Sequence, residues 1–261
     1  MSNTKRVIYK FPHTFKDDKG KIRGDLFEKH IINTDKEFHF SAGILKLEDF
    51  EREGLIELNK HKISIFNATF NDEYSKLKRG AQTISKKDIG PIITRTGINR
   101  NSTIIDAGAG SGGLTCYLAS IAKRVDTFDV NEKNLEVTEK NVKRLKLDNV
   151  KLELKNIYED TLFLEEEYDV FTLDVPEPWQ ALQTASKTLK LGGYLAVYTP
   201  NIMQARETIL NMPKSLFHEE SLEIIEREWT INDRVSRPIT KDFSHTAFLI
   251  FFRKIGKHTK K

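Results

Sequence analysis

The chain has 261 residues, of which 38% are hydrophobic and 31% are charged, and it carries a net charge of +4 and a single cysteine. These totals indicate a soluble globular protein with enough apolar residues for one large domain and a small one. A single cysteine excludes a disulfide within the chain, and no apolar run in the sequence approaches the roughly 20 residues that a membrane crossing needs. No signal-type apolar segment follows the first residues, so the expected compartment is the cytoplasm.

The charges are unevenly distributed along the chain. Residues 1–80 carry a net charge of +3, residues 241–261 a net charge of +5, and residues 81–240 a net charge of −4. An acidic body with basic ends favours a polyanionic partner that is held from the periphery. Ordinary solvated lysines are the alternative interpretation of the same totals.

The first 75 residues alternate between short apolar runs and turn-prone segments. Strands are predicted at residues 6–11 and 62–66 and near residues 38–40, and residues 45–58 are expected to be partly helical. We therefore expect a small β-rich domain over residues 1–75, followed by a larger domain over residues 76–261.

Residues 85–97 are predicted to form a helix, because Ser85 and Asp88 have capping-box spacing. Residues 103–114 then read Thr-Ile-Ile-Asp-Ala-Gly-Ala-Gly-Ser-Gly-Gly-Leu, which is a short β-branched run followed by an acid and a glycine-rich turn. Glycines at such a turn allow positive φ and let a flat ligand lie against bare backbone.

The glycine spacing alone leaves the ligand open. Gly108, Gly110 and Gly113 suit a dinucleotide, Gly108, Gly110 and Gly112 suit a nucleoside methyl donor, and a tight turn without a ligand is a third interpretation. Asp106 favours the methyl donor, because a carboxylate there would repel a pyrophosphate but suits the cationic amino acid end of S-adenosylmethionine.

Strands and helices alternate from residue 103 onwards, which predicts a parallel sheet covered on both faces. After the strand at 103 and its helix, strands are expected at residues 124–130, 150–155, 168–174 and 193–199, and helices at 131–147, 178–189 and 202–212. Two consecutive strands, 221–231 and 245–254, indicate an antiparallel edge pair. This ending is more typical of the methyltransferase variant of the doubly wound fold than of a dehydrogenase.

Asp174 ends the fourth predicted strand and begins the sequence Asp-Val-Pro-Glu-Pro-Trp. Open α/β sheets bind ligands at this edge. The two prolines fix φ, so the Asp174 carboxylate and the Trp179 indole keep their places before a substrate arrives. This arrangement suits a site that holds a planar base against a reactive group. A rigid loop in which Asp174 caps the next helix is the alternative.

Several motifs occur together in an order that is typical of one family. They are Arg79–Ile84, Lys87-Asp88, the glycine turn, residues 173–179, Tyr198-Thr199-Pro200 with Gln204, Arg237-Pro238 and His245–Phe248. Over roughly residues 79–254 the chain resembles the S-adenosylmethionine-dependent tRNA (adenine-N1)-methyltransferases of T-loop position 58, in their archaeal and bacterial form. The resemblance implies an α/β fold with a Rossmann-like class I methyltransferase sheet and antiparallel C-terminal edge strands, and it implies tRNA as partner and a homotetramer.

The resemblance also implies where the cofactor lies. The ribose hydroxyls would bind Asp129, where the family usually has a glutamate. Asn156 stands where the family usually has an aspartate that reads the cofactor's adenine, and its side-chain oxygen can accept the same hydrogen bond. The implied cofactor-binding residues are Gln82, Asp106, Gly108, Gly110, Ser111, Gly112, Gly113, Leu114, Asp129, Asn156, Ile157 and Asp174.

For the reaction, the resemblance implies Asp174, Tyr198 and Gln82 as catalytic residues, and Trp179, Tyr198 and His245 as substrate-binding residues. By residue type alone, Trp179 serves equally well in a core and His245 is more often structural. Adenine N1 needs no deprotonation before it attacks a sulfonium methyl group, and a carboxylate that accepts from the exocyclic amine binds the developing cation more tightly than the neutral base. The target base must be flipped out of the T loop to reach the site.

Two other functions fit parts of the sequence. One is methylation of another acceptor, such as an isoaspartyl carboxylate, and the other is a non-catalytic RNA-binding subunit of a methyltransferase complex. The sequence does not distinguish methylation of position 58 alone from methylation of positions 57 and 58. No zinc-ligand spacing is present, so no metal is expected.

Overall fold

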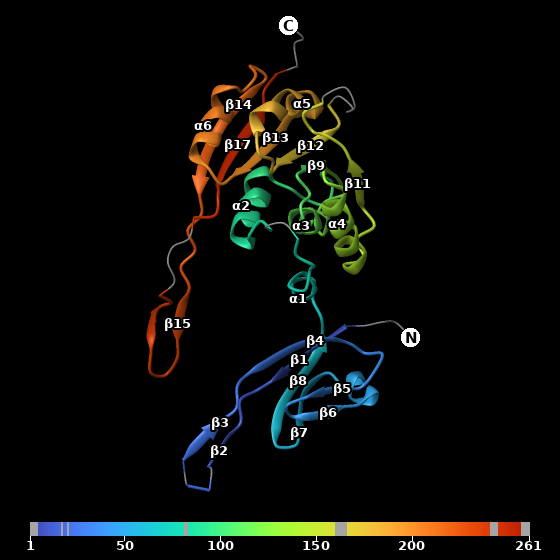
Figure 1. The fold of residues 1–261 in the computed structure, drawn as a ribbon, viewed down its shortest axis with the longest axis vertical. Coiled ribbons are helices and arrows are strands. Elements are labelled where there is room, and N and C mark those ends of the chain that lie inside the picture. The colour runs from blue at the N-terminus through green and yellow to red at the C-terminus, as the bar shows by residue number, and fades with distance from the viewer. Residues whose placement is uncertain are drawn as a thin grey trace. The chain divides into compact units, whose positions relative to one another are not determined.

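The computed structural model describes residues 5–16, 18–19, 21–80, 83–159, 166–240 and 245–256. The chain divides into two compact units, Met1–Leu77 and Lys78–Lys261 (Figure 1). Among the described helices, none has the length and apolar character that a membrane crossing requires.

The first unit is built on a four-stranded antiparallel sheet with the order β4-β1-β8-β7. Ile8, Ile63 and Ile65 on one face of this sheet pack with Leu45 and Phe50 into a small core. The strands of the unit are β1 (Lys5–Lys10), β2 (Thr14–Lys16), β3 (Ile22–Gly24), β4 (Glu28–Asn33), β5 (Phe38–Phe40), β6 (Gly43–Leu45), β7 (Gly54–Leu58) and β8 (His61–Asn67), with a 3-10 helix η1 (Leu47–Glu51) and a short helix α1 (Phe70–Tyr74).

The expectation that residues 45–58 are partly helical is confirmed at Leu47–Glu51 and not over the rest of the range. Only η1 is helical, and β7 pairs antiparallel with β8 through a two-residue turn. Asn59 and Lys60 form that turn with φ of 47° and 72°. Positive φ at both positions matches the twist of a β-hairpin, so strand pairing with β8 overrides the local helical pattern.

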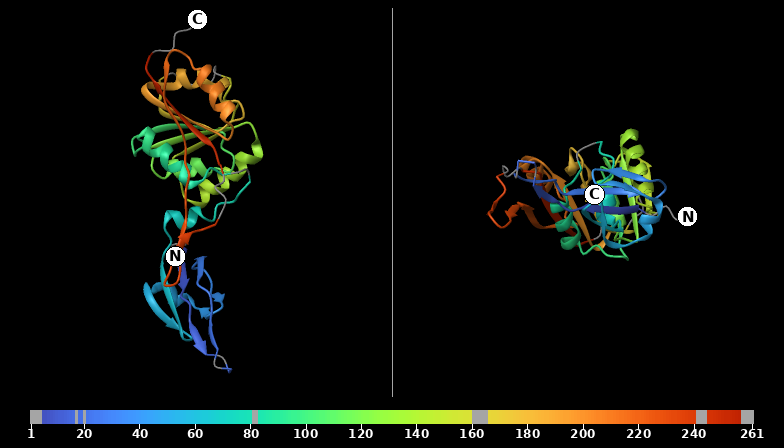
Figure 2. Two further views of the ribbon diagram at one scale, coloured as in Figure 1. Left: turned by 90° about the vertical axis from the view of Figure 1, so that its left-hand side faces the viewer. Right: turned by 90° about the horizontal axis from the view of Figure 1, so that it is seen from below.

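The second unit contains a seven-stranded mixed sheet with the order β11-β10-β9-β12-β13-β17-β14. The first five strands are parallel, and β17 is antiparallel to both β13 and β14. Helices α2, α3 and α4 pack against one face and α5 and α6 against the other (Figures 1 and 2). This arrangement confirms the predicted α/β fold with its antiparallel C-terminal edge strands.

The elements of this unit follow the predicted alternation of strands and helices. They are α2 (Lys86–Thr96), β9 (Thr103–Ala107), α3 (Gly113–Ala119), β10 (Arg124–Asp129), α4 (Glu132–Arg144), β11 (Val150–Leu154), β12 (Tyr168–Leu173), η3 (Pro178–Ala181), α5 (Leu182–Thr188), β13 (Leu189–Thr199), α6 (Ile202–Leu210), β14 (Leu216–Glu223), β15 (Trp229–Ile231), β16 (Ser236–Pro238) and β17 (Phe248–Lys254).

The predicted strand at 221–231 is misplaced. The observed strand β14 begins at Leu216 and ends at Glu223, which pairs with Phe248, the first residue of β17. Residues 224–231 pair with no strand of this sheet, and Trp229–Ile231 pairs instead with Ser236–Pro238 in a separate hairpin.

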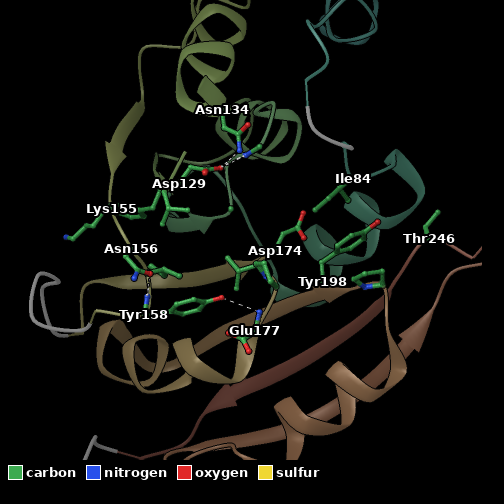
Figure 3. A pocket seen from close by; sticks show the side chains of 18 residues that line it. Ile84, Asp129, Asn134, Lys155, Asn156, Tyr158, Asp174, Glu177, Tyr198 and Thr246 are labelled. Carbon is green, nitrogen blue, oxygen red and sulfur yellow. Dashed lines mark hydrogen bonds between the residues drawn. The ribbon is translucent and has the colours of Figure 1, made fainter. Parts of the chain in front are cut away.

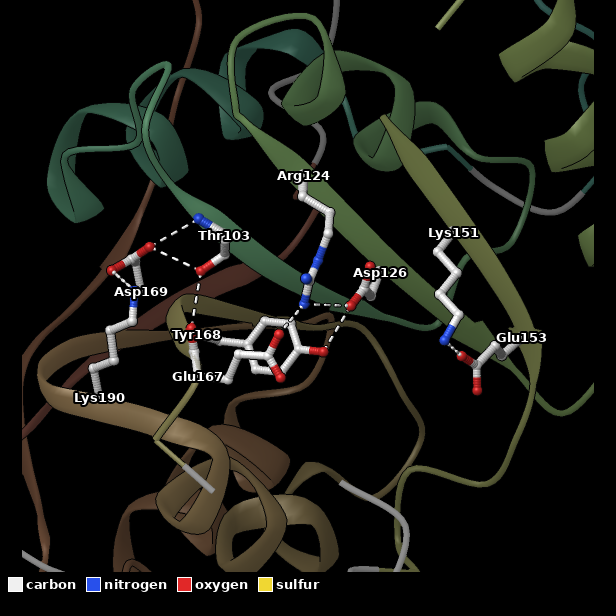
Figure 4. Close-up of polar contacts among 9 residues, drawn as sticks. All are labelled: Thr103, Arg124, Asp126, Lys151, Glu153, Glu167, Tyr168, Asp169 and Lys190. Carbon is white, nitrogen blue, oxygen red and sulfur yellow. Dashed lines mark hydrogen bonds and ion pairs between the residues drawn. The ribbon is translucent and has the colours of Figure 1, made fainter. Parts of the chain in front are cut away.

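A polar network holds the amino ends of the central strands in register (Figure 4). The Tyr168 hydroxyl donates to Asp126 at 2.6 Å, and the Arg124 guanidinium lies 3.0 Å from the same carboxylate. On the neighbouring strands, Asp169 accepts from the backbone N–H of Thr103 at 2.8 Å and pairs with Lys190. These contacts leave the opposite ends of the same strands to build the site.

Candidate active site

The glycine turn after β9 brings that strand against the end of β12. The backbone N–H of Asp174 donates to the carbonyl of Ala107 at 2.9 Å. Gly108 has φ of +91°, and a Cβ there would lie 1.9 Å from the Asp174 carbonyl oxygen. Gly112 has φ of +75°, and its Cβ would lie 2.7 Å from the Thr138 side chain. Only glycine therefore permits this turn.

A cavity of about 530 Å³ opens at the carboxyl ends of the parallel strands (Figure 3). Asp174 lies near its centre, with Asn156 and Tyr158 on one side and Tyr198 and Thr246 on the other. Seven residues expected from the sequence line it together: Gly108, Gly110, Asp129, Asn156, Ile157, Asp174 and Tyr198.

Asp129 stands at the end of β10 and faces this cavity. Its carboxylate accepts hydrogen bonds from the backbone N–H of Gly110 at 3.0 Å, from that of Asn131 at 2.8 Å and from the Asn134 side-chain amide at 3.0 Å. Asn131 also caps α4, because its own side chain accepts from the N–H of Lys133. The acid is thus held rigidly beside the glycine backbone.

Asp174 combines burial with a lack of compensating contacts. Burial raises the pKa of its carboxyl to about 7, and the nearby charges of Asp106 and Asp129 add to the rise. Among the described residues, no side chain donates a hydrogen bond to this carboxylate. A carboxylate in such a place gains when a donor or a positive charge enters the cavity.

Asp106 lies beneath the turn and does not line the cavity. Its side chain is 2% exposed and accepts hydrogen bonds from the hydroxyls of Thr115 at 2.6 Å and Thr172 at 2.7 Å. Burial raises its pKa to about 6. In this structure the acid joins α3 to β12, and its expected contact with a cationic ligand end stays a prediction.

Asn156 and Tyr158 form the wall of the cavity after β11. The Asn156 side-chain oxygen accepts from the backbone N–H of Tyr158 at 3.1 Å. The Tyr158 hydroxyl accepts from the N–H of Glu177 at 3.2 Å, which ties this wall to the turn after Asp174. A carbonyl oxygen has two lone pairs, so Asn156 can accept a further hydrogen bond from a ligand.

Tyr198 lies at the end of β13, beside Asp174. Burial raises the pKa of its phenol to about 12, with contributions from the charges of Asp88 and Asp174. His245 does not line the cavity. Its ring bridges the Glu223 carboxylate and the carbonyl of Pro200, which does line it.

The other expected site residues lie outside the cavity lining. Trp179 packs against the main core cluster, and Ser111 contacts the Thr83 hydroxyl at 2.9 Å. Gly112, Gly113 and Leu114 continue the turn into α3. Gln82 lies outside the described residues.

Sequence reasoning did not single out several residues of the lining as binding residues. Four of them lie close in sequence to a predicted site residue: Phe128 precedes Asp129, Asn134 follows it by five residues, and Lys155 and Tyr158 flank Asn156 and Ile157. The full set is Ile84, Phe128, Val130, Asn134, Lys155, Tyr158, Val175, Pro176, Glu177, Pro200 and Thr246. Among the described residues, no group of His, Cys, Asp and Glu side chains is arranged to hold a metal ion.

Comparison with known protein families places these features in context. Residues 73–235 match the family model described as tRNA methyltransferase complex GCD14 subunit. The chain is 32% identical to the tRNA (adenine(57)-N(1)/adenine(58)-N(1))-methyltransferase TrmI of Methanocaldococcus jannaschii, over 91% of this chain and 93% of that protein. It is also 32% identical to a tRNA (adenine(58)-N(1))-methyltransferase TrmI of Thermus thermophilus, over 74% of this chain and 77% of that protein.

Solved structures show the same fold. A SAM-dependent O-methyltransferase from Thermotoga maritima matches with a TM-score of 0.79 and 25% identity, over 100% of this chain and 96% of that one. A tRNA (m1A58) methyltransferase TrmI from Aquifex aeolicus matches with a TM-score of 0.75 and 23% identity, over 98% of both chains. Because these two proteins are named for different acceptors, the fold alone does not identify the atom that is methylated.

Proposed function

The chain belongs to the tRNA methyltransferase complex GCD14 subunit family, and from this premise we propose that it transfers a methyl group from S-adenosylmethionine to N1 of adenosine 58 in the T loop of tRNA. Relatives that share 32% identity carry this activity in their names, one for position 58 and one for positions 57 and 58. Position 57 is therefore the second candidate target.

The cavity fits the proposed cofactor in size and chemistry. Its volume of about 530 Å³ lies within the range of small-molecule sites. Gly108 and Gly110 offer bare backbone, Asp129 offers a carboxylate for the ribose hydroxyls, and Asn156 offers an amide for the adenine edge. When bound, S-adenosylmethionine supplies an electrophilic methyl group on a sulfonium.

The observation that carries the proposal is the half-buried Asp174 carboxylate, which lines the cavity and has no hydrogen-bond donor among the described residues. As adenine N1 takes up a methyl group, positive charge spreads onto the ring and its exocyclic amine. Asp174 can accept a hydrogen bond from that amine. Because the bond is stronger to the cation than to the neutral base, it stabilises the transition state more than the bound substrate.

The surrounding residues orient this carboxylate. The Asp174 backbone is fixed to Ala107, and Tyr158 holds the N–H of Glu177 three residues later. Tyr198 and Pro200 close the side of the cavity next to the carboxylate. Since Asp174 has a pKa of about 7 in the free protein, it is also suited to take a proton from the methylated base as the product leaves.

The proposal extends to partners and assembly. Residues 1–80, with a net charge of +3, and residues 241–261, with a net charge of +5, would contact tRNA phosphates, so binding should weaken steeply with salt. A homotetramer and a cytoplasmic location accompany this function by resemblance to the family. The proposed catalytic set is Asp174, Tyr198 and Gln82, with Trp179 and His245 as supports of the substrate side.

The test is mass spectrometry of nucleosides and oligonucleotides from tRNA incubated with the protein and S-adenosylmethionine. We expect 1-methyladenosine at position 58, and the same digest reports position 57. Methylation of damaged proteins in place of tRNA would favour the isoaspartyl alternative. Absence of both reactions, with tRNA binding retained, would favour a non-catalytic subunit.

A further inference from the structure

Gln204 accompanies Tyr198-Thr199-Pro200 among the sequence motifs but has no part in the mechanism above. It is the third residue of α6 and follows the N-cap residue Asn201 by three positions. A glutamine at this position commonly folds back onto the backbone N–H of the N-cap residue in a capping box. Here the Gln204 side chain leaves its own helix and reaches two chain segments beside the cavity.

The Gln204 amide joins the turn after β12 to the end of β13. Its Nε2 donates to the carbonyl of Pro176 at 2.7 Å, and its Oε1 accepts from the Thr199 hydroxyl at 2.7 Å. A carbonyl oxygen can only accept, so the amide nitrogen must face Pro176 and the amide oxygen must face Thr199. A side chain that bridges these two places therefore needs a donor and an acceptor at once.

The Pro176 contact bears on Asp174, because it holds the turn that carries this carboxylate. The turn is fixed at Asp174 by a backbone bond to the end of β9, and at Glu177 by the Tyr158 hydroxyl. Pro176 lies between these two points and has no N–H. In the part of the chain that the structure describes, the hydrogen bond that its carbonyl accepts comes from Gln204.

The Thr199 contact holds the wall of the cavity next to Asp174. Thr199 is 1% exposed, and its chain neighbours Tyr198 and Pro200 both line the cavity. The side chains of Asp174 and Tyr198 lie on adjacent parts of the lining (Figure 3). The Gln204 side chain thus connects the turn that carries one of them to the strand end that carries the other.

We propose that Gln204 is a positioning residue that fixes the spacing between the Asp174 turn and the Tyr198 wall. This inference rests on the proposed function for the identity of the substrate. With the spacing fixed, the Asp174 carboxylate meets the exocyclic amine of the target adenine at hydrogen-bond distance, and a displacement of about 1 Å can cost on the order of 100-fold in rate. Neither partner of Gln204 belongs to the residues proposed to bind S-adenosylmethionine, so cofactor affinity should not depend on this bridge.

The test is a double-mutant cycle on the single-turnover rate of tRNA methylation. Gln204→Met keeps nearly the same length but cannot donate to Pro176. In the wild-type background we expect it to slow methylation about 10-fold, with S-adenosylmethionine affinity retained in calorimetry. In the Asp174→Ala background the carboxylate is already missing, so the same substitution should change the rate by less than about 2-fold.

Gln180→Met is the matched control. The Gln180 amide also donates a hydrogen bond of 2.7 Å near this turn, but to the Glu177 side chain and not to the backbone. This control should methylate tRNA at the wild-type rate. Thr199→Val removes the other end of the bridge and keeps the shape of that side chain, so it serves in the same cycle where Gln204→Met does not fold.

The outcomes of the cycle separate positioning from a general structural role. A loss in the wild-type background that disappears in Asp174→Ala supports the proposal, because Gln204 then acts through the carboxylate. Equal losses in both backgrounds, or no loss in either, would overturn it. A wild-type protein that does not methylate tRNA would instead contradict the proposed function itself.

Discussion

Replacing Asp174 by asparagine should remove activity and stabilise the fold above neutral pH. The asparagine side chain has nearly the same shape but no charge, so the change isolates the cost of burying the carboxylate. Burial and the neighbouring acids raise the pKa of Asp174 from 3.8 to about 7. That difference of about three pKa units, at about 1.4 kcal/mol each, corresponds to roughly 4 kcal/mol of lost stability once the group is ionised.

The sign follows from proton binding. The folded state holds this proton to a higher pH than the unfolded state does, so wild-type stability falls as the pH rises from about 4 to about 7. The buried amide of Asp174→Asn lacks a partner and costs about 1–3 kcal/mol. The variant should therefore be more stable than wild type by roughly 1–3 kcal/mol at pH 8, and should have no advantage near pH 4.

Urea denaturation at several pH values measures this difference. Both tryptophans, Trp179 and Trp229, lie in the unit that contains the cavity, so their fluorescence reports on its unfolding. Asp169→Asn, in β12 five residues before Asp174, is the matched control. Pairing with Lys190 lowers the pKa of Asp169, so this control should be less stable than wild type at pH 8. A stability difference for Asp174→Asn that is the same at pH 4 and pH 8 would refute the reasoning.

Three further predictions test the parts around this carboxylate. Gly108→Ala should destabilise the fold by about 3 kcal/mol or more and abolish cofactor binding, because the new Cβ would lie 1.9 Å from a carbonyl oxygen at a residue with φ of +91°. Gly90→Ala is the control: a Cβ at this position in α2 meets no atom within 4 Å, so the variant should be neutral or stabilising in the same denaturation assay. Asn156→Asp should tighten S-adenosylmethionine binding by about 3- to 10-fold in calorimetry, because a carboxylate is the stronger acceptor, and unchanged affinity would argue that this side chain does not meet the ligand. The ring of His245 should titrate above 6.5 by NMR and return toward 6.5 in Glu223→Gln, since both ring nitrogens face acceptors and the protonated form is lost as the pH rises.

The alternation of strands and helices in the second unit could be predicted because local signals agree with the fold. Asn131, the first residue of the predicted helix at 131–147, caps α4, and Gly97, the last residue of the predicted helix at 85–97, ends α2 in the left-handed conformation. The prediction is wrong for the ends of the strand at 221–231, and it does not foresee strand β7 within residues 45–58, because pairing partners decide those segments. A local pattern carries no information about where β8 or β17 begins.

Site residues that end a strand could be predicted from the sequence, whereas residues that reach the site through the pairing of distant strands could not. Asp129 and Asp174 each end a strand, so the topology alone brings them to one edge. Thr246 reaches the cavity only because β17 inserts between β13 and β14. The burial of Asp106 was also hidden, because its threonine partners come from α3 and β12, which the sequence does not place on either side of it.

The proposed mechanism requires that the negative group at residue 174 serves methyl transfer to adenine N1. The most direct measurement is single-turnover methylation of tRNA by wild type and Asp174→Ala, with S-adenosylmethionine affinity determined in parallel by calorimetry. We predict 1-methyladenosine at position 58 for wild type, and for the variant a loss of about 100-fold or more in rate with cofactor affinity retained. A variant that methylates position 58 at the wild-type rate would contradict the account.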